Sequence, residues 1–473
     1  MNLVQALSNT GHTANGAITN KKTLNACLDL FWQAPTENEL ETIEELYNNA
    51  MLENHKIATQ LSFWLRDPRQ GAGRRTNGRL LTTLLSQDLE FTESSFKNFL
   101  HAITHFGRFD DLLFLLDTNH AEIVSHYWMS QIRKGNALAA KWAPRESSTN
   151  KRYARIIAKN CYLSMKDYRK VITKASSTVE QLMCSKKWED IVFEHVPSQA
   201  MRRLRKAFAK HQDVRFAQYN EEVASGTKSI NASTLYPHQI LGECVDVNLG
   251  CGFYEKSIAQ AVELDPTMTN LWNNQPNWVQ DVPTLVVADT SGSMSGLPMQ
   301  IAVSLAIYTA QRLPEPWKNS FITFSSRPSF VTLDESLTIA QNITKIPSII
   351  ENTDLNATFE LILNTAKRNR ISQEQMPSQI VIISDMQFDH AQEGKTNFEV
   401  IEAQYRAAGY TRPNLVFWNV NSRFKSTCPV TFDEAGTALV AGYSPSILKS
   451  ISGGNMDPIA VMLSTLERYP DSF

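Results

Sequence analysis

The sequence predicts a chain of two parts, an array of helical repeats followed by a doubly wound α/β domain. Residues 23–271 show apolar positions recurring at intervals of three and four, which is typical of helices with one buried face. From residue 284 onward, short apolar runs alternate with helical stretches, the pattern of a mainly parallel sheet covered by helices. Between the two parts, residues 265–284 are rich in Pro, Asn and Asp and indicate a linker.

The helical part reads as consecutive helix pairs without strands between them. "ETIEELYNNAMLENHKIATQLSFWLRD" (41–67) is one long helical stretch, and "SSFKNFLHAITHFGRFDDLLFLL" (94–116) is two helices broken at Gly107. Pairs of this length that cover each other's apolar faces form an α-solenoid of the HEAT type. We therefore predict an N-terminal extension over 1–22 and a helical-repeat domain over 23–278.

The C-terminal part, residues 279–473, is predicted to be the doubly wound, Rossmann-like domain. The expected helices follow Leu297, begin near Leu355 and Phe398, and close the chain. The expected strands are "TLVVAD" (284–289), "SFITFS" (320–325), "QIVIISD" (379–385), "NLVFWNV" (414–420) and "ALVAGY" (438–443).

Composition excludes several classes of protein. No apolar run reaches the roughly 20 residues of a membrane helix, and the N-terminus lacks the basic and apolar regions of a secretory signal, so we expect a cytoplasmic protein without a membrane span. The six cysteines show no CxxC spacing, which argues against a zinc site or a disulfide framework. The net charge is −2, but residues 151–215 carry 16 Lys and Arg against 6 Asp and Glu, which points to an anionic partner.

A metal site is predicted where two of the expected strands end. Asp289 ends the first strand and is followed by Ser291 and Ser293, and Asp385 ends the strand at 379–385. In a doubly wound sheet, ligands bind beyond the carboxyl ends of the strands. Carboxylate and hydroxyl oxygens without His or Cys suit a hard divalent cation, Mg²⁺ or Mn²⁺. The alternative is a turn in which Asp289 caps a helix and the serines bind no ion.

The D-x-S-x-S pattern after a strand resembles the metal-ion-dependent adhesion site of von Willebrand factor A domains. That resemblance implies a threonine ligand from a later loop and an aspartate from a later strand end. "ENTDLNATFELIL" offers Thr353 or Thr358, and we prefer Thr353 because it directly precedes the predicted helix. The implied ligands are Asp289, Ser291, Ser293, Thr353 and Asp385. Such a site leaves one position for water or for a carboxylate of a partner.

The stretch "SFWLRDPRQGAGRR" (62–75) resembles the "IRD…G.G.R" signature of TROVE modules. These modules are the ring of helical repeats found in the Ro autoantigen and its bacterial relatives. Further stretches, among them "GRFDDLLFLL", "AAKWAPRE" and "WEDIVFEHVPSQAMRRLRKAF", resemble an uncharacterised TROVE-like branch of viruses, bacteria and plants. The resemblance implies a monomeric ring closed by the A domain, with single-stranded ends of noncoding RNA in the central hole and structured RNA outside.

The basic segment supplies candidate RNA contacts. On "SQAMRRLRKAFAKHQ", Met201, Leu204 and Phe208 are predicted to face the core, so that the basic residues of this helix project away from it. Basic side chains on a rigid face neutralise phosphates, and nearby aromatics, Tyr153, Tyr162, Tyr168 and Trp188, could stack on bases. The RNA-binding candidates are Arg202, Arg203, Arg205, Lys206, Lys210, Lys186, Lys187, Arg169 and Lys170. The alternative is a solvated helix face with the aromatics in the core.

A second basic group, Arg66, Arg69, Arg74 and Arg75, flanks Gly71 and Gly73. Here the sequence leaves two interpretations open, an RNA contact or a structural turn, suggested by Asp67 and the glycines, with a buried Arg–Asp pair. The leading hypothesis for the whole chain is a non-catalytic RNA scaffold or chaperone. The runner-up is an assembly or virion component whose metal site captures a carboxylate of an acidic protein partner. We do not expect an enzyme, because no acid–base pair, nucleophile or phosphate loop accompanies the metal ligands.

Overall fold

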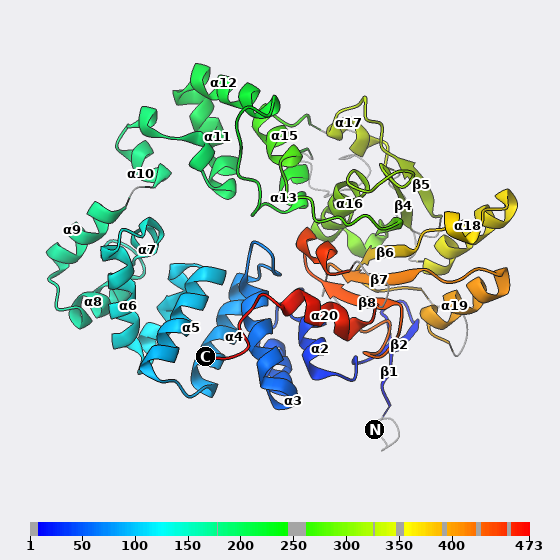
Figure 1. Ribbon diagram of the computed structural model, residues 1–473, viewed down its shortest axis with the longest axis horizontal. Helices are drawn as coiled ribbons and strands as arrows, with labels where there is room; N and C mark the ends of the chain where they lie inside the picture. The colour runs from blue at the N-terminus through cyan, green and yellow to red at the C-terminus, as the bar shows by residue number, and fades with distance from the viewer. Residues whose placement is uncertain are drawn as a thin grey trace. The chain divides into compact units, whose positions relative to one another are not determined.

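The computed structural model describes residues 8–176, 178–244, 262–324, 327–346, 354–389, 395–421, 427–451 and 456–473 (Figure 1). Within these residues the chain forms two compact units. The α/β unit comprises Met1–Glu53 and Leu235–Arg468, and the helical unit comprises Asn54–Thr234 and Tyr469–Phe473.

A six-stranded mixed sheet forms the centre of the α/β unit, in the order β5-β4-β3-β6-β7-β8. All neighbouring strands are parallel except β4 and β5, which are antiparallel. The central strands are buried along their whole length, which explains their continuous Val, Ile and Leu content. The strands are β3 (Thr284–Asp289), β4 (Ser320–Phe324), β5 (Ser329–Thr332), β6 (Gln379–Ser384), β7 (Asn414–Asn419) and β8 (Thr437–Ala441).

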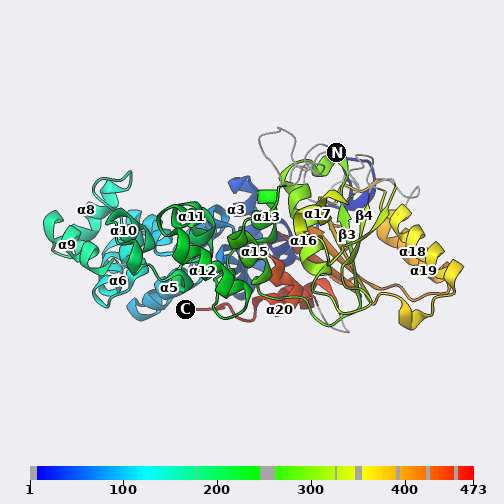
Figure 2. The same cartoon turned by 90° about the horizontal axis from the view of Figure 1, so that it is seen from above.

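Helices cover both faces of this sheet. Figure 2 shows α16 (Leu297–Ala310) on one side and α18 (Leu355–Asn369) with α19 (Asn397–Ala408) on the other. Helix α16 is buried on nearly all its faces because it packs between the sheet and α13, so its sequence is apolar throughout. The other elements of this region are α13 (Pro237–Leu241), η4 (Gly242–Cys244), α15 (Pro266–Asn273), η6 (Gly292–Met294), α17 (Ile339–Thr344), η7 (Gln373–Gln375), η8 (Pro445–Lys449) and α20 (Pro458–Leu466).

The N-terminal residues belong to the α/β unit. Helix α2 (Ala26–Gln33) begins at the side-chain cap of Asn25 and packs against β8 and α20. Before it, β1 (Thr10–His12) and β2 (Ile18–Asn20) form a hairpin. Three β-bridges join this hairpin to residues far away in the sequence, Gly16 to Asp389, Ile18 to Thr396 and Asn20 to Cys428.

The helical unit begins within α3 (Leu40–Arg66), at Asn54, where the backbone leaves helical geometry with φ −155° and ψ 96°. Helices adjacent in the chain pack on one another, among them α5 on α6 and α11 on α12. The helices after α3 are α4 (Arg75–Asp88), α5 (Glu93–Phe106), η1 (Phe109–Asp117), α6 (Ala121–Arg133), α7 (Ala137–Trp142), α8 (Lys151–Asn160), α9 (Met165–Ala175), α10 (Val179–Cys184), η2 (Trp188–Asp190), η3 (Phe193–His195), α11 (Ser198–His211) and α12 (Asp213–Ala224).

The predicted fold class, helices followed by an α/β sheet, is confirmed in outline, and so is the break at Gly107, which caps α5. The prediction of a linker over 265–284 is wrong in its first half, because Asp265 caps α15 and Met268, Leu271 and Trp272 are buried. The compact units also divide the chain elsewhere than at the predicted boundaries after residues 22 and 278. None of the described helices has the length and apolar character needed to cross a membrane.

Candidate metal centre and nucleic-acid interface

The predicted metal ligands Asp289 and Asp385 lie at the ends of two adjacent parallel strands. β3 pairs with β6 so that Ala288 lies opposite Ile383, which brings both carboxyl ends to the same edge of the sheet. Ser291 and Ser293 follow β3, and their hydroxyl oxygens are 3.2 Å apart. The structure therefore brings four of the five predicted residues to this edge.

Asp289 is fully buried and held by hydrogen bonds on both carboxylate oxygens. Oδ1 accepts from the backbone N–H of Ser291 at 2.9 Å, and Oδ2 accepts from the Ser384 hydroxyl at 2.5 Å. Burial first, and the charge of Asp385 second, raise the pKa of Asp289 to about 7, against the lowering effect of these hydrogen bonds. Two carboxylates that repel each other in a buried site favour a cation between them.

The predicted threonine ligand, Thr353, lies outside the described residues. Helix α18 begins at Leu355 and is capped by Asp354. Thr358 lies inside α18 and is fully buried, and within the described residues its hydroxyl oxygen has no hydrogen-bond partner.

The N-terminal hairpin holds the loop that carries Asp385, a feature the sequence analysis missed. Thr13 Oγ1 donates to the Phe388 carbonyl at 2.8 Å, and Asn15 Nδ2 donates to the Gln387 carbonyl at 2.7 Å. Gln387 Oε1 in turn accepts from the Ala14 N–H at 2.6 Å. The position of Asp385 therefore depends on residues more than 360 positions earlier in the chain.

The donor set fits a hard divalent cation better than zinc. It consists of two carboxylates and the hydroxyls of Ser291 and Ser293, with no His or Cys. Among the described residues there is no group of three or more His, Cys, Asp or Glu that could hold a metal ion. Hydroxyls must therefore supply part of any coordination at this edge.

The predicted RNA-binding residues of α11 separate into an exposed and a buried set. Arg203, Lys206 and Lys210 are exposed and follow the spacing i, i+3 and i+7, so they form one stripe, which we call the basic face of α11. In the described part of the chain, no ion pair neutralises these three residues. Arg202 is half-buried.

The prediction that Arg205 projects into solvent is wrong. Its exposed fraction is 9%, and its guanidinium donates to the carbonyl of Arg202 in the same helix. Position 205 lies four residues after Met201 and three before Phe208, and both of these are buried. Residues at that spacing share a helix face, so Arg205 lies on the core side.

The remaining basic candidates lie on the elements before α11. Lys186 and Lys187 follow α10 and are exposed, as are Arg169 and Lys170 on α9. Arg169 Nη1 is 3.6 Å from Glu146 Oε2, a surface pair that contributes little to stability. All four side chains are accessible to an anionic partner.

The aromatic candidates are mostly structural. Tyr153 is nearly buried and donates to Asp117, and Tyr168 is buried with its hydroxyl donating to the Pro144 carbonyl. Trp188 is half-buried and stacks on His211, with ring centroids 4.3 Å apart. Only Tyr162 among the four is largely exposed, at 89%, in the turn after α8. It is the one of these four rings that could stack on an unpaired base.

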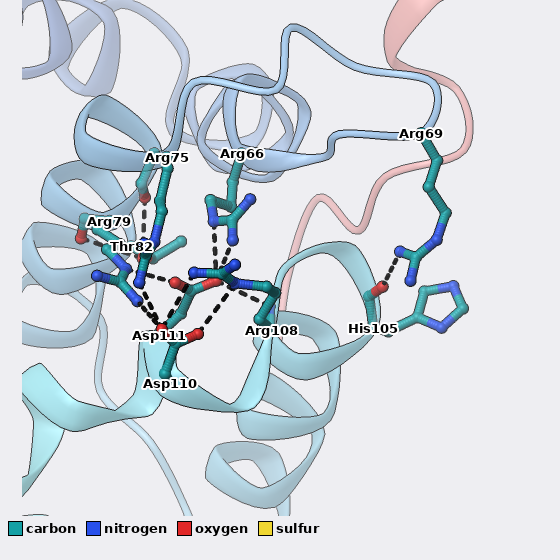
Figure 3. A network of polar contacts seen from close by, with 10 residues as sticks. Arg66, Arg69, Arg75, Arg79, Thr82, His105, Arg108, Asp110 and Asp111 are labelled. Carbon is teal, nitrogen blue, oxygen red and sulfur yellow. Dashed lines mark hydrogen bonds and ion pairs between the residues drawn. The ribbon is translucent and has the colours of Figure 1, made fainter. Parts of the chain in front are cut away.

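The second basic group joins a network of ion pairs (Figure 3). The sequence left a buried Arg–Asp pair as one interpretation, and the structure contains one, but the partner of Arg66 is Asp111 at 2.7 Å rather than Asp67. Asp67 instead accepts from the Arg69 N–H at 2.9 Å, and Arg69 Nη1 donates to the His105 carbonyl. The network was not predicted, because Asp110 and Asp111 lie more than 30 residues after the glycine-rich motif.

Two glycines make the network possible. A Cβ on Gly78 of α4 would lie 2.6 Å from Cβ of Arg66, so only glycine allows this close approach of α4 to α3. A Cβ on Gly107 would lie 2.4 Å from an Asp111 carboxylate oxygen. Both contacts are too short for any side chain, which explains these glycines by packing.

Comparison with known proteins gives matches to both parts of the chain. Residues 283–459 match a family described as "Domain of unknown function (DUF7788)", and residues 135–282 match one described as "Domain of unknown function (DUF2828)". An uncharacterized protein of Acanthamoeba polyphaga mimivirus is 25% identical over 525 residues, which cover 98% of this chain and 88% of that protein. The crystal structure of the Deinococcus radiodurans RO (RSR) protein covers 93% of this chain and 99% of its own, with 12% identity and a TM-score of 0.43.

Proposed function

We propose that the chain is a non-catalytic RNA-binding protein that holds noncoding RNA through the basic face of α11. The observation that carries the proposal is the stripe formed by Arg203, Lys206 and Lys210, exposed and without ion-pair partners in the described residues. A rigid helix with cations at this spacing neutralises phosphates along one strand, and each contact releases counterions. Phosphate contacts of this kind position a strand without selecting its sequence.

Other residues of the helical unit could also contact RNA. Lys186, Lys187 and Lys170 add exposed positive charge, and the ring of Tyr162 is accessible for stacking on a base. Residues 151–215 carry an excess of ten positive charges in a chain of net charge −2. This local excess favours an anionic partner for the segment. The TROVE-like sequence motifs support noncoding RNA with single-stranded ends as the partner. They also support a monomeric ring of helical repeats as the part of the protein that binds this RNA.

The metal site belongs to the same proposal. Asp289, Ser291, Ser293 and Asp385, with Thr353, would hold Mg²⁺ or Mn²⁺ at the edge of the sheet. The cation would supply an open coordination position for water or a partner's carboxylate. The buried repulsion between Asp289 and Asp385 supports an ion at this place.

The proposal is tested by binding a single-stranded RNA to the full chain and to a variant with Arg203, Lys206 and Lys210 changed to Gln. Gln keeps the helix propensity and removes three charges. The matched control changes Lys367, Arg368 and Lys395, exposed residues of the α/β unit, to Gln. We expect the first variant to lose at least about tenfold in affinity, at roughly 0.5 kcal/mol or more per contact, and the control to bind like the parent. Equal losses in both variants, or none in the first, would contradict the proposal. A parent chain that binds no RNA would favour the assembly hypothesis.

A further inference from the structure

The network of Figure 3 carries more positive than negative charge. Four guanidinium groups surround the two carboxylates, an excess of two charges. In the described residues no further carboxylate pairs with these four arginines. We call this group the arginine cluster, and it consists of Arg66, Arg75, Arg79 and Arg108 around Asp110 and Asp111.

One half of the arginine cluster is structural. The side chains of Arg66 and Asp111 are 6% and 1% exposed, and Asp111 also accepts from Arg79 Nε and from the N–H of Arg108 at 2.8 Å. This half joins α3, α4 and η1, and removal of either partner would leave a buried charge, which is strongly destabilising.

The other half is accessible. The side chains of Arg75 and Arg108 are 47% and 31% exposed, and both pair with Asp110. Arg79 Nη2 lies 3.1 Å from the same carboxylate, so one negative charge is shared by three guanidinium groups. Within the described residues the Nη1 atoms of Arg75 and Arg108 have no acceptor. Burial lowers the pKa of Arg75, and the neighbouring Arg79 charge lowers it further, which reflects the excess of positive charge.

The surroundings keep these guanidinium groups in place. Arg108 lies over the ring of Trp142, 4.1 Å from its centroid, and Arg79 lies 5.3 Å from the centroid of Phe114. Arg75 is the first residue of α4, a helix of 14 residues with no acidic side chain in its first turn. The groups are therefore preorganised, and the helix dipole adds to the positive potential at Arg75.

We propose that Arg75, Arg79 and Arg108 form a binding site for a phosphate group. Planar guanidinium forks match the oxygen spacing of phosphate. A backbone phosphodiester would offset one of the two excess charges of the arginine cluster, and a free phosphate or phosphomonoester would offset up to two. The phosphate can come from two sources. It is either a backbone phosphate of RNA, in which case the inference rests on the proposed function, or a free phosphate or phosphomonoester.

Inorganic phosphate is the first probe. The Tm of the full chain is measured in phosphate and in chloride at equal pH and ionic strength, and the phosphate affinity is obtained by titration. We expect phosphate to raise the Tm, and Arg75→Gln to weaken its binding about tenfold, the effect of losing one hydrogen bond between charged groups. Arg155→Gln, an exposed arginine of α8, serves as the control and should respond like the parent. Equal Tm values in the two salts, or an undiminished response in Arg75→Gln, would overturn the site.

A second variant has the opposite expected sign. Asp110→Asn neutralises the carboxylate that now occupies three guanidinium groups, so phosphate should bind more tightly than to the parent, and weaker binding would contradict the proposal. RNA binding then identifies the source. Loss of RNA affinity in Arg75→Gln, together with competition by inorganic phosphate, indicates a backbone phosphate. Unchanged RNA affinity in Arg75→Gln, together with a phosphate response that the parent shows and Arg75→Gln loses, indicates a free phosphate. This result stands even if the chain binds no RNA.

Discussion

At the scale of single residues, the strongest constraint is the buried carboxylate of Asp289. Changing Asp289 to Asn removes one of two repelling charges and one ligand of the proposed cation. Addition of Mg²⁺ or Mn²⁺ should raise the free energy of unfolding of the parent by about 2.7 kcal/mol at one hundred times the dissociation constant, and so raise its Tm, because the ion binds only the folded state. Asp289→Asn should lose this gain, and Asp281→Asn, an exposed control, should keep it. A full response in Asp289→Asn would show that the ligands are assigned wrongly.

The metal-site carboxylates could be predicted from the sequence because each directly follows or ends a strand that the sequence makes visible. Asp289 and Asp385 end strands whose apolar runs are visible in the sequence, so their meeting at one edge followed from parallel pairing. Arg205 was mispredicted because the apolar face was assigned through Leu204, whereas the core side of α11 runs through Arg205. A basic side chain can occupy the core side when a carbonyl accepts from it, and composition alone does not reveal that.

At the scale of elements, the N-terminal hairpin should affect the metal site. Thr13→Val with Asn15→Ala removes two hydrogen bonds to the loop that carries Asp385, each worth about 1 kcal/mol. We expect a lower Tm and a shift of the Mg²⁺ titration to higher concentration, because the loop is held less firmly. Thr10→Val, an exposed position on β1, is the control. A lower Tm with an unchanged titration would make the hairpin structural only.

Most long elements were predictable from periodicity, and the short ones were not. The five predicted strands are present. The sixth strand, β5, was not predicted, because it is only four residues long, half-exposed and antiparallel to β4, and its sequence shows no continuous apolar run. The strands β1 and β2 have three residues each, and their bridges lead to residues 389, 396 and 428. Helix α15 was missed because Pro and Asn dominate its surroundings, although Asp265 and Pro266 form an ordinary helix start.

At the scale of the whole molecule, the two units interleave along the chain. Helix α2 lies far from the sheet in sequence but buries Cys27, Leu28, Phe31 and Trp32 in the α/β unit, and the Trp32 Nε1–H donates to the Thr427 carbonyl at 3.2 Å. A fragment of residues 279–473 lacks α2 and exposes part of β8. We predict that this fragment aggregates and shows no sharp thermal transition.

The matched comparison is a chain in which residues 54–234 are replaced by a flexible Gly/Ser linker and residues 469–473 are removed. It retains every residue of the α/β unit and should unfold in one cooperative transition, detected by near-UV circular dichroism. If the fragment 279–473 unfolds as sharply and at the same temperature, the N-terminal elements are dispensable and the division into units is wrong.

The central claim, that the basic face of α11 holds RNA through phosphates, is tested most directly by the salt dependence of binding. Affinity for a single-stranded RNA is measured over a series of salt concentrations for the parent and for the variant with Arg203, Lys206 and Lys210 changed to Gln. Each phosphate contact contributes a slope of roughly −0.7 in log K against log salt, so three contacts contribute about two units. We predict that the parent's slope is steep and that the variant's is shallower by up to about two. Superimposable lines for the two proteins would contradict the account.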